Sequence, residues 1–265
     1  MKIAVFVPMY RSTSAQCASI IQQAVNAAAC AGHQVTHTMH ADALVDEGRN
    51  FCLGRHANEC DYAIFIDDDM KPEEQSINKI VALDRPVASC LLSTRAEPVE
   101  LVIRIWNEKL HGFSHAENFR TNYPVEGKHP NPPFAVGAAF LCIRRDAIDA
   151  LKEYYLTARD WIEADRSLMD RLRVRSENRE VERARKEVIR RELYKNEYYL
   201  RIFDRDFQGG ERRVSEDITF SMKLMQLGIP ITIDPTIRVT HTGERDYSWE
   251  DYIPPTLRAI YAAAS

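Results

Sequence analysis

Short apolar runs alternate with longer amphipathic segments along the first 95 residues. Four runs have the length and hydrophobicity of strands, three of them almost continuously apolar and one alternating: residues 2–8, 33–40, 61–67 and 86–92. The segments between them have helical spacing: residues 14–32, 47–60 and 72–83. Ser14 is a candidate N-cap of the first helix, and Gly32 is a candidate stop. Strands separated by helices predict a parallel sheet covered on both faces, which is an α/β fold.

The regular alternation ends after residue 95. Residues 98–106 and 135–145 again predict strands, and the irregular loop 122–134 between them is rich in Pro, Gly, His and Asn. A loop of this length inside a compact domain often covers a binding site. Residues 146 to about 200 have helical character. A capped helix and two short strands are predicted next: 215–228, 229–235 and 237–243.

Composition and charge narrow the classes of function. The chain of 265 residues is 45% hydrophobic and 28% charged, which is ordinary for a globular protein. Its formal net charge of -4 argues against a protein that binds nucleic acid by bulk charge. Six cysteines without CxxC spacing predict buried free thiols in a reducing compartment. We find no signal peptide and no apolar run of about 18 residues, so we expect no membrane span and a cytoplasmic location.

The stretch AIFIDDDM (63–70) carries an apolar strand directly into Asp67, Asp68 and Asp69. In open α/β sheets, ligands bind outside the carboxyl ends of the strands, and these acids fall at such an end. Two carboxylates about 4 Å apart repel by roughly 4 kcal/mol at an effective dielectric constant of about 20. A bound cation relieves that repulsion, and oxygen ligands favour Mg²⁺ or Mn²⁺. The alternative is an acidic turn whose side chains spread into water.

Polar side chains recur at the ends of two later elements. Glu216 and Asp217 open the helix predicted at 215–228, and His241 lies near the end of the strand predicted at 237–243. Carboxylates and an imidazole together are able to hold a metal-bound diphosphate and to activate a hydroxyl group. The ordinary alternatives are a helix cap for Asp217 and a structural role for His241.

The order of these motifs resembles that of a family 2-like glycosyltransferase of the GT-A fold. The matching motifs are VPMY, GRN, DYAIFIDDDM, VGAAFLCIRRDAI, SEDITFSMKLMQLGIPITIDP and VTHTG. The resemblance covers roughly residues 1–150 and 213–245. It implies one α/β domain, with a Rossmann-like nucleotide-binding sheet, helices on both faces and a long helical insertion. The implied parts are a nucleotide-sugar half at 1–95, an acceptor and catalytic half at 96–150 and 213–245, the insertion at 151–212, and a C-terminal tail at 246–265.

The resemblance also implies roles for individual residues. Asp67 and Asp69 match the family's metal-binding DxD pair, and His241 matches a late histidine that ligates the metal or contacts the diphosphate. Asp217 matches the acid that deprotonates the acceptor hydroxyl, with Glu216 as its neighbour. The residues implied in holding the nucleotide sugar are Pro8, Tyr10, Arg49, Asn50, Asp67 and Asp68.

The implied activity is metal-dependent transfer of a sugar to an acceptor hydroxyl, with inversion. The implied cofactor is Mn²⁺ or Mg²⁺, and the implied donor is a nucleoside-diphosphate sugar, commonly a uridine diphosphate sugar. Two other classes stay open. One is a nucleotidyltransferase on a related scaffold, although the chain has no Gly-rich phosphate loop after its first strand. The other is a non-enzymatic module that binds nucleic acid.

Two regions depart from the family pattern. VGAAF (136–140) replaces the usual small-residue strand, and the region 150–212 has no counterpart in the minimal family. Within it, residues 171–195 are dense in Arg with Glu interspersed. They predict either a solvated helix with internal ion pairs or an arm that contacts a phosphate backbone.

The second interpretation of residues 171–195 makes hydroxymethylated bases in DNA the expected acceptor, as for virus-encoded enzymes. Protein, glycan and small-molecule acceptors are the alternatives. If the protein is viral, we expect it in the host cytoplasm. Arg49 also has a simpler interpretation, as an exposed helix residue.

Overall fold

The computed structural model describes most of the chain outside the region 155–201 and the C-terminus. The described residues are 1–9, 13–41, 44–56, 59–95, 99–107, 112–115, 125–127, 134–154, 202–203, 207–208, 212–213, 215–243, 245–248 and 251.

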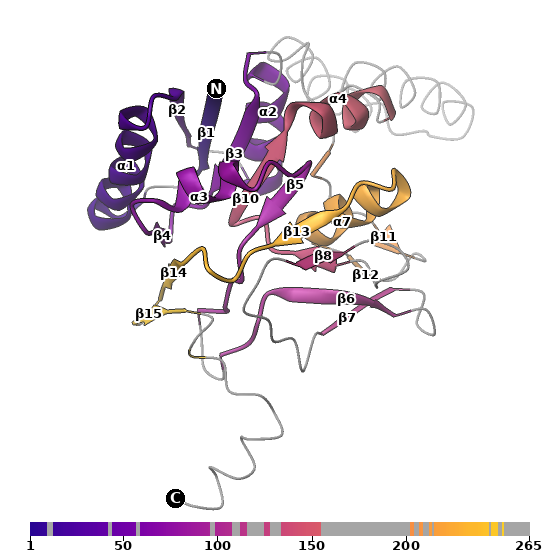
Figure 1. Cartoon of the computed structure of the whole chain (residues 1–265). Coiled ribbons are helices and arrows are strands. Elements are labelled where there is room, and N and C mark those ends of the chain that lie inside the picture. Colours follow the sequence, from indigo (N-terminus) through magenta and orange to yellow (C-terminus); the bar gives the residue numbers. More distant parts are fainter. Residues whose placement is uncertain are drawn as a thin grey trace, which may run out of the picture.

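A seven-stranded sheet forms the centre of the molecule (Figure 1). Its strands, in spatial order, are β2 (Gln34–His40), β1 (Lys2–Pro8), β3 (Tyr62–Ile66), β10 (Phe140–Arg144), β5 (Val87–Ser89), β13 (Ile231–Ile233) and β8 (Val125–Gly127). Strand β10 pairs antiparallel with β3 and β5, and β8 pairs antiparallel with β13, whereas the other pairings are parallel. The predicted α/β class is therefore confirmed, and the sheet is mixed rather than purely parallel.

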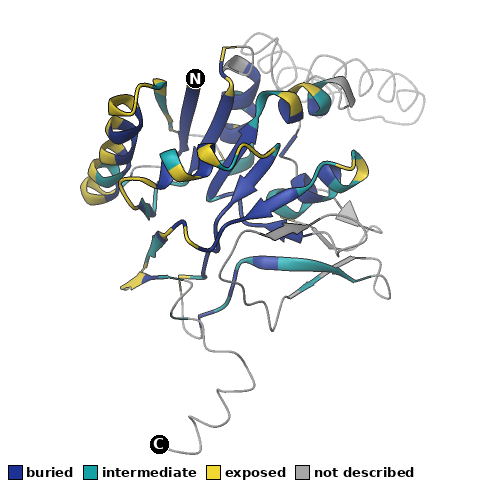
Figure 2. Cartoon of the chain, in the orientation of Figure 1, coloured by how far each residue is buried: buried dark blue, intermediate teal, exposed yellow. Residues whose placement is uncertain are grey.

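Helices cover both faces of this sheet, because both faces of its central strands are apolar. In β1, the side chains of Ile3, Val5 and Val7 belong to one buried cluster and those of Ala4 and Phe6 to the other. The first cluster is covered by α1 (Ala15–Cys30) and α3 (Ser76–Ala82). The second is covered by α2 (Val45–His56), α4 (Arg145–Tyr154) and α7 (Glu216–Gln226). Figure 2 shows the central strands β1, β3, β10 and β5 buried and the outer side of α1 exposed.

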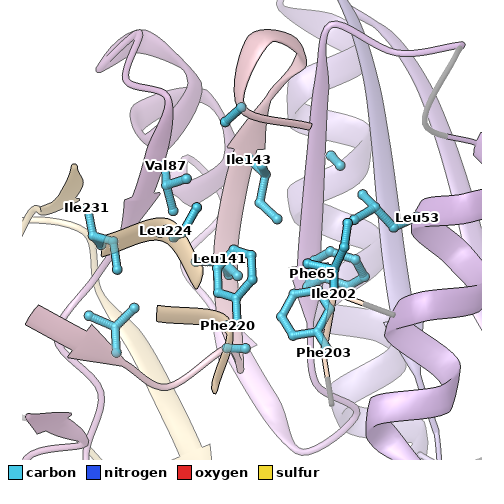
Figure 3. Close-up of a cluster of buried hydrophobic side chains, with 14 of the residues drawn as sticks. Leu53, Phe65, Val87, Leu141, Ile143, Ile202, Phe203, Phe220, Leu224 and Ile231 are labelled. Carbon is cyan, nitrogen blue, oxygen red and sulfur yellow. The ribbon is translucent and has the colours of Figure 1, made fainter. Parts of the chain in front are cut away.

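Residues 202–203 are inserted into the second of these clusters (Figure 3). Ile202 and Phe203 are both 0% exposed. The Phe203 ring stacks on Phe220 with centroids 4.5 Å apart and meets Phe65 edge-on at 5.4 Å. Burial of one such ring stabilises the fold by about 1.5–3 kcal/mol. These two residues therefore join the sheet to α7.

Three smaller sheets surround the central one. The first consists of β4 (Met70–Pro72), β14 (Val239–Thr242) and β15 (Asp246–Tyr247). The second consists of β7 (Gly112–His115), β6 (Ile103–Asn107) and β9 (Phe134–Val136). The third consists of β11 (Phe207–Gln208) and β12 (Arg212–Arg213). Strand β14 lies between β4 and β15, and β6 lies between β7 and β9. The first of these sheets brings residues after Val239 against the turn that follows β3.

The ends of α1 follow the sequence signals, whereas the cap predicted for the helix at 215–228 is not formed: Ser215 precedes α7, but its side chain makes no capping hydrogen bond and its hydroxyl donates to Asp217. The hydroxyl of Ser14 accepts a hydrogen bond from the Cys17 backbone N–H at 3.0 Å, so the predicted N-cap of α1 is confirmed. Gly32 and Gly228 have φ values of +89° and +67°, in the left-handed region that glycine adopts without strain. Both predicted stops, after α1 and α7, are therefore confirmed.

Three predicted boundaries are wrong. The helix predicted at 72–83 begins only at Ser76, because Met70–Pro72 pairs with β14 as strand β4. The strand predicted at 98–106 is displaced to Ile103–Asn107. The loop 122–134 contains Val125–Gly127, which pairs with β13 as β8. In each case, strand pairing with a segment distant in sequence overrides the local pattern.

The strand predicted at 135–145 is two strands. Phe134–Val136 pairs with β6, and Phe140–Arg144 enters the central sheet. The chain turns between them at Gly137. A Cβ atom at this glycine would lie 2.8 Å from Val102 Cγ1, so the close approach of the two segments requires the absence of a side chain.

The predicted helical insertion is described only at its ends. Helix α4 extends to Tyr154, and residues 202–203, β11 and β12 are also described. The remainder of 151–212, including 171–195, and most of the tail 246–265 lie outside the described residues. All six cysteines are free, and five of them are buried as predicted, whereas Cys30 is exposed. Within the described part of the chain, no helix is both long enough and apolar enough to cross a bilayer.

Candidate active site

The central sheet changes direction of winding between β1 and β3. From β1 the chain passes through α1 to β2 on one side, and it returns through α2 to β3 on the other side of β1. Outside the carboxyl ends of two such strands, the connections diverge and leave a ligand-binding crevice. Pro8 ends β1, and Asp67 follows the last residue of β3. The acidic residues therefore lie at the place where open α/β sheets bind ligands.

A tight turn places the three acids after β3. The Asp67 backbone N–H donates to Ala139 O at 2.9 Å, and the Met70 N–H donates to Asp67 O at 3.1 Å. The Thr13 hydroxyl donates to Asp68 O at 2.7 Å. Burial, followed by the charges of Asp69 and Asp67, raises the pKa of Asp68 to about 6. The three carboxylates have different environments, and their partners differ accordingly.

Asp67 is held by a buried arginine from α2. The Arg49 side chain is 3% exposed, and its Nη2 lies 2.6 and 2.9 Å from the two carboxylate oxygens of Asp67. Its Nη1 lies 3.1 Å from Glu216 Oε1. Burial alone would lower the pKa of Arg49, but the charges of Asp67 and Glu216 outweigh burial and raise it. We call these three residues the Arg49 cluster; it joins α2, the end of β3 and the start of α7.

The neighbouring Asn50 holds the inserted residues 202–203. Its Oδ1 accepts from the Ile202 and Phe203 backbone N–H groups, each at 2.8 Å, and its Nδ2 donates to Phe203 O at 2.7 Å. The Arg49 guanidinium lies 5.7 Å from the centroid of the Phe203 ring. Arg49 and Asn50 of the GRN motif thus both make internal contacts. Arg49 is not the exposed helix residue of the simpler interpretation.

Asp69 interacts with a histidine from β14. His241 Nε2 lies 3.1 Å from Asp69 Oδ2, and His241 Nδ1 lies 2.9 Å from the Ser93 carbonyl oxygen. A carbonyl oxygen only accepts, so Nδ1 carries a proton and Nε2 faces the carboxylate. Burial would lower the pKa of His241, but the bonds to Asp69 and Ser93 outweigh it and raise the pKa. Nε2 therefore needs either its own proton or a cation beside it.

The positions of these two atoms suit a divalent cation. Mg²⁺ and Mn²⁺ hold ligands in octahedral geometry, so neighbouring ligands at about 2.1 Å from the ion lie about 3 Å apart. The separation of 3.1 Å between His241 Nε2 and Asp69 Oδ2 matches this value. Among the described residues, no group of three or more His, Cys, Asp or Glu side chains is arranged to hold a metal. If an ion binds here, these two atoms would be its protein donors, and water or substrate oxygens would complete the shell.

Asp217 lies in the first turn of α7. Its Oδ1 accepts from the Ile218 N–H at 2.8 Å and from the Ser215 hydroxyl. An acidic side chain is a favourable residue in the first turn of a helix, where the backbone N–H groups are unpaired. Glu216, one residue earlier, instead contacts Arg49. Both neighbouring acids line the same pocket, but only Glu216 pairs with the buried Arg49.

One pocket of about 110 Å³ brings these elements together. It is lined by Arg49, Asp67, Leu92, Ser93, Val102, Gly137, Ala138, Ala139, Glu216, Asp217 and His241. Five residues predicted from the sequence thus share one pocket, and Asp69 is bonded to one of them, His241. Pro8 lies at the end of β1 but does not line it, and Tyr10 lies outside the described residues.

Sequence reasoning missed three parts of the site. Ser93 supplies the carbonyl that orients His241, and Arg95 Nη1 lies 2.7 Å from Asp69 Oδ2. Residues 137–139 line the pocket, where the sequence indicated only a continuous strand. Neither Ser93 nor Arg95 is part of a recognisable sequence motif, so the sequence alone does not indicate their roles. The signal for 137–139 was the glycine at position 137, which marks a close approach of two segments.

Comparison with known proteins does not identify a family for this chain: no family model matches it, and neither does any curated protein.

Proposed function

We propose that this protein is a metal-dependent glycosyltransferase of the family 2-like, GT-A kind, which uses a nucleoside-diphosphate sugar. The observation that supports it most is the shared pocket. Asp67, Asp217 and His241 come from the end of β3, the start of α7 and strand β14, and they line one pocket at the carboxyl edge of the sheet. Acids at a strand end, a base candidate and an imidazole are the groups that transfer from a metal-bound diphosphate requires.

Asp69 and His241 would hold Mn²⁺ or Mg²⁺ in this proposal. When bound, the ion neutralises charge on the departing diphosphate. Asp217 takes the proton of the acceptor hydroxyl, whose oxygen attacks the anomeric carbon from the face opposite the leaving group. The Arg49 cluster acts through position only, because Glu216 ties the first turn of α7, and hence Asp217, to the turn that carries Asp69.

The test is donor hydrolysis with a panel of nucleotide sugars, in Mn²⁺ or in chelator. We expect Mn²⁺-dependent release of nucleoside diphosphate from one donor. Asp69→Asn should lower this release on the order of 10²-fold, because the ion loses a charged ligand. Asp246→Asn is the matched control, since Asp246 is an exposed acid paired with Lys71 and does not line the pocket. Equal release by Asp69→Asn and the wild type, or release unaffected by chelator, would contradict the proposal.

The acceptor that we propose is a hydroxymethylated base in DNA. It rests on the Arg-rich residues 171–195, which lie outside the described residues. A protein that neutralises phosphates loses affinity steeply as salt rises. DNA binding should therefore fall with salt, and it should be abolished when four arginines are changed to Glu: Arg183, Arg185, Arg190 and Arg191. Absence of DNA binding at low salt would contradict this acceptor and leave the proposed transfer reaction intact.

A further inference from the structure

Asp69 Oδ2 has two nitrogen partners, one from an arginine and one from a histidine. Arg95 Nη1 lies 2.7 Å from this oxygen, and His241 Nε2 lies 3.1 Å from the same oxygen. Within the described part of the chain, Asp69 Oδ1 accepts no hydrogen bond. A divalent cation bound between Oδ2 and Nε2 would thus come directly beside the Arg95 guanidinium. Two positive charges this close repel each other, and a partly buried site screens that repulsion less than bulk water does. Arg95 and the ion therefore compete for one carboxylate oxygen.

Exposure indicates which partner of Asp69 is able to leave. The Arg95 side chain is 64% exposed, whereas the His241 side chain is 18% exposed. His241 is also fixed through its second ring nitrogen by Ser93 O. An ion pair with an exposed arginine contributes little to stability, so Arg95 leaves Asp69 at small cost.

The backbone that carries Arg95 is held in place beside the site. Thr94 N–H donates to Glu100 O at 2.8 Å, and its hydroxyl accepts from the Glu100 N–H at 3.0 Å. A Cβ atom at Gly243 would lie 2.8 Å from Arg95 O, so the turn between β14 and β15 approaches this backbone closely. Release of Arg95 from Asp69 would therefore leave its guanidinium within reach of any anion bound at the pocket.

We propose that Arg95 is an exchangeable counter-ion, which pairs with Asp69 when no metal is bound and turns to the diphosphate of the nucleotide when a metal takes its place. This inference rests on the proposed metal-dependent transfer. A guanidinium has five N–H donors and binds phosphate oxygens well, whereas in the described structure only one donor group, Nη1, reaches Asp69. Without metal, Arg95 would thus neutralise the charge of the Asp69 carboxylate. With metal bound, it would favour the binding of an anionic ligand.

Two binding experiments test the exchange without turnover. The first titrates Mn²⁺ alone into the protein and follows free Mn²⁺ by electron paramagnetic resonance. The second titrates uridine diphosphate in saturating Mn²⁺. The variants are Arg95→Ala, Arg95→Lys and Asp69→Asn. Lys79→Ala is the matched control, because Lys79 and Glu73 form an exposed ion pair on and before α3, with side chains 43% and 46% exposed.

The exchange predicts opposite changes for one variant. Arg95→Ala should bind Mn²⁺ alone about two- to fivefold more tightly, since an exposed competitor is removed. It should bind uridine diphosphate with Mn²⁺ about tenfold more weakly, since a charge-assisted hydrogen bond is lost. Arg95→Lys should lie between Arg95→Ala and the wild type in both experiments. Lys79→Ala should match the wild type.

The outcomes separate this inference from the proposed function. Loss of Mn²⁺ binding in Asp69→Asn, with no tightening in Arg95→Ala, overturns the exchange and leaves the metal site standing. Equal Mn²⁺ binding by the wild type and Asp69→Asn overturns the metal site, and the exchange with it. Weakening of both ligands in Arg95→Ala shows a purely structural role for Arg95 and also overturns the exchange.

Discussion

Two arginines bind two aspartates of the same turn, and they differ mainly in burial. Arg49 holds Asp67 with both oxygens engaged, and its side chain is 3% exposed. Arg95 holds Asp69 through one oxygen, and its side chain is 64% exposed. A buried charge must keep its partners, because water cannot replace them, whereas an exposed charge exchanges partners freely. An Arg–Asp pair is thus part of the internal structure at Asp67. Two positions later, at Asp69, an Arg–Asp pair is a replaceable contact in our proposal.

The largest expected effect comes from breaking the Arg49 cluster. Arg49→Met leaves the carboxylates of Asp67 and Glu216 without their shared cation, and removal of one member of a buried pair costs about 3–5 kcal/mol. We expect the free energy of unfolding in urea to fall by about 3 kcal/mol or more. Arg49→Lys should lose less, because it keeps the charge but not the planar fork. A loss below about 1 kcal/mol in Arg49→Met would show that the cluster is not structural.

The second effect concerns the residues that Asn50 holds. Asn50→Ala leaves the buried N–H groups of Ile202 and Phe203 without acceptors, and each unsatisfied group costs about 1–3 kcal/mol. We expect the free energy of unfolding to fall by about 2–3 kcal/mol. Asn26→Ala is the control, since Asn26 is exposed and accepts only from the exposed Gln22 side chain, at 2.9 Å, among the bonds of the described residues. If Asn50→Ala instead keeps its stability and loses nucleotide binding, the role implied by the family resemblance is correct.

A smaller effect is expected at the pocket wall. Gly137→Ala adds a methyl group 2.8 Å from Val102 Cγ1, and overpacking of this kind costs about 1–3 kcal/mol. Val102→Ala removes the atom that the new methyl group meets. The double variant should therefore lose less free energy of unfolding than the two single variants lose together. We expect the difference to be about 1 kcal/mol in a double-mutant cycle. Additive free energies of unfolding would show that the two residues are not in contact.

The smallest effect on stability is expected for the Asp69 pair. Arg95→Ala should change the free energy of unfolding by less than about 1 kcal/mol, because an exposed ion pair contributes little. Urea unfolding of Arg95→Ala and Arg49→Met under the same conditions tests the comparison directly. If both variants lose the same stability, burial does not distinguish the two arginines.

Much of the fold was predictable because its signals are local. Strands β1, β2, β3 and β5, together with α1 and α7, are read from hydrophobic periodicity, a Ser cap and two stopping glycines. The end of β3 placed Asp67, Asp68 and Asp69 at the ligand-binding edge, since the carboxyl ends of parallel strands meet there. The boundaries that failed, at Met70–Pro72 and at residues 135–145, depend on pairing with strands distant in sequence.

The candidate site divides in the same way. The sequence by itself determined which residue types stand at the ends of elements: the acids after β3, the acid pair that opens α7, and His241 on β14. Only the tertiary structure decided which residues these side chains contact. The sequence separation is 18 residues for Arg49 and Asp67, 167 for Arg49 and Glu216, and 172 for His241 and Asp69. Periodicity reports the surface that one element buries, but ion pairing and exposure depend on which elements meet. For that reason Arg49 and Arg95 could not be told apart until the chain was folded.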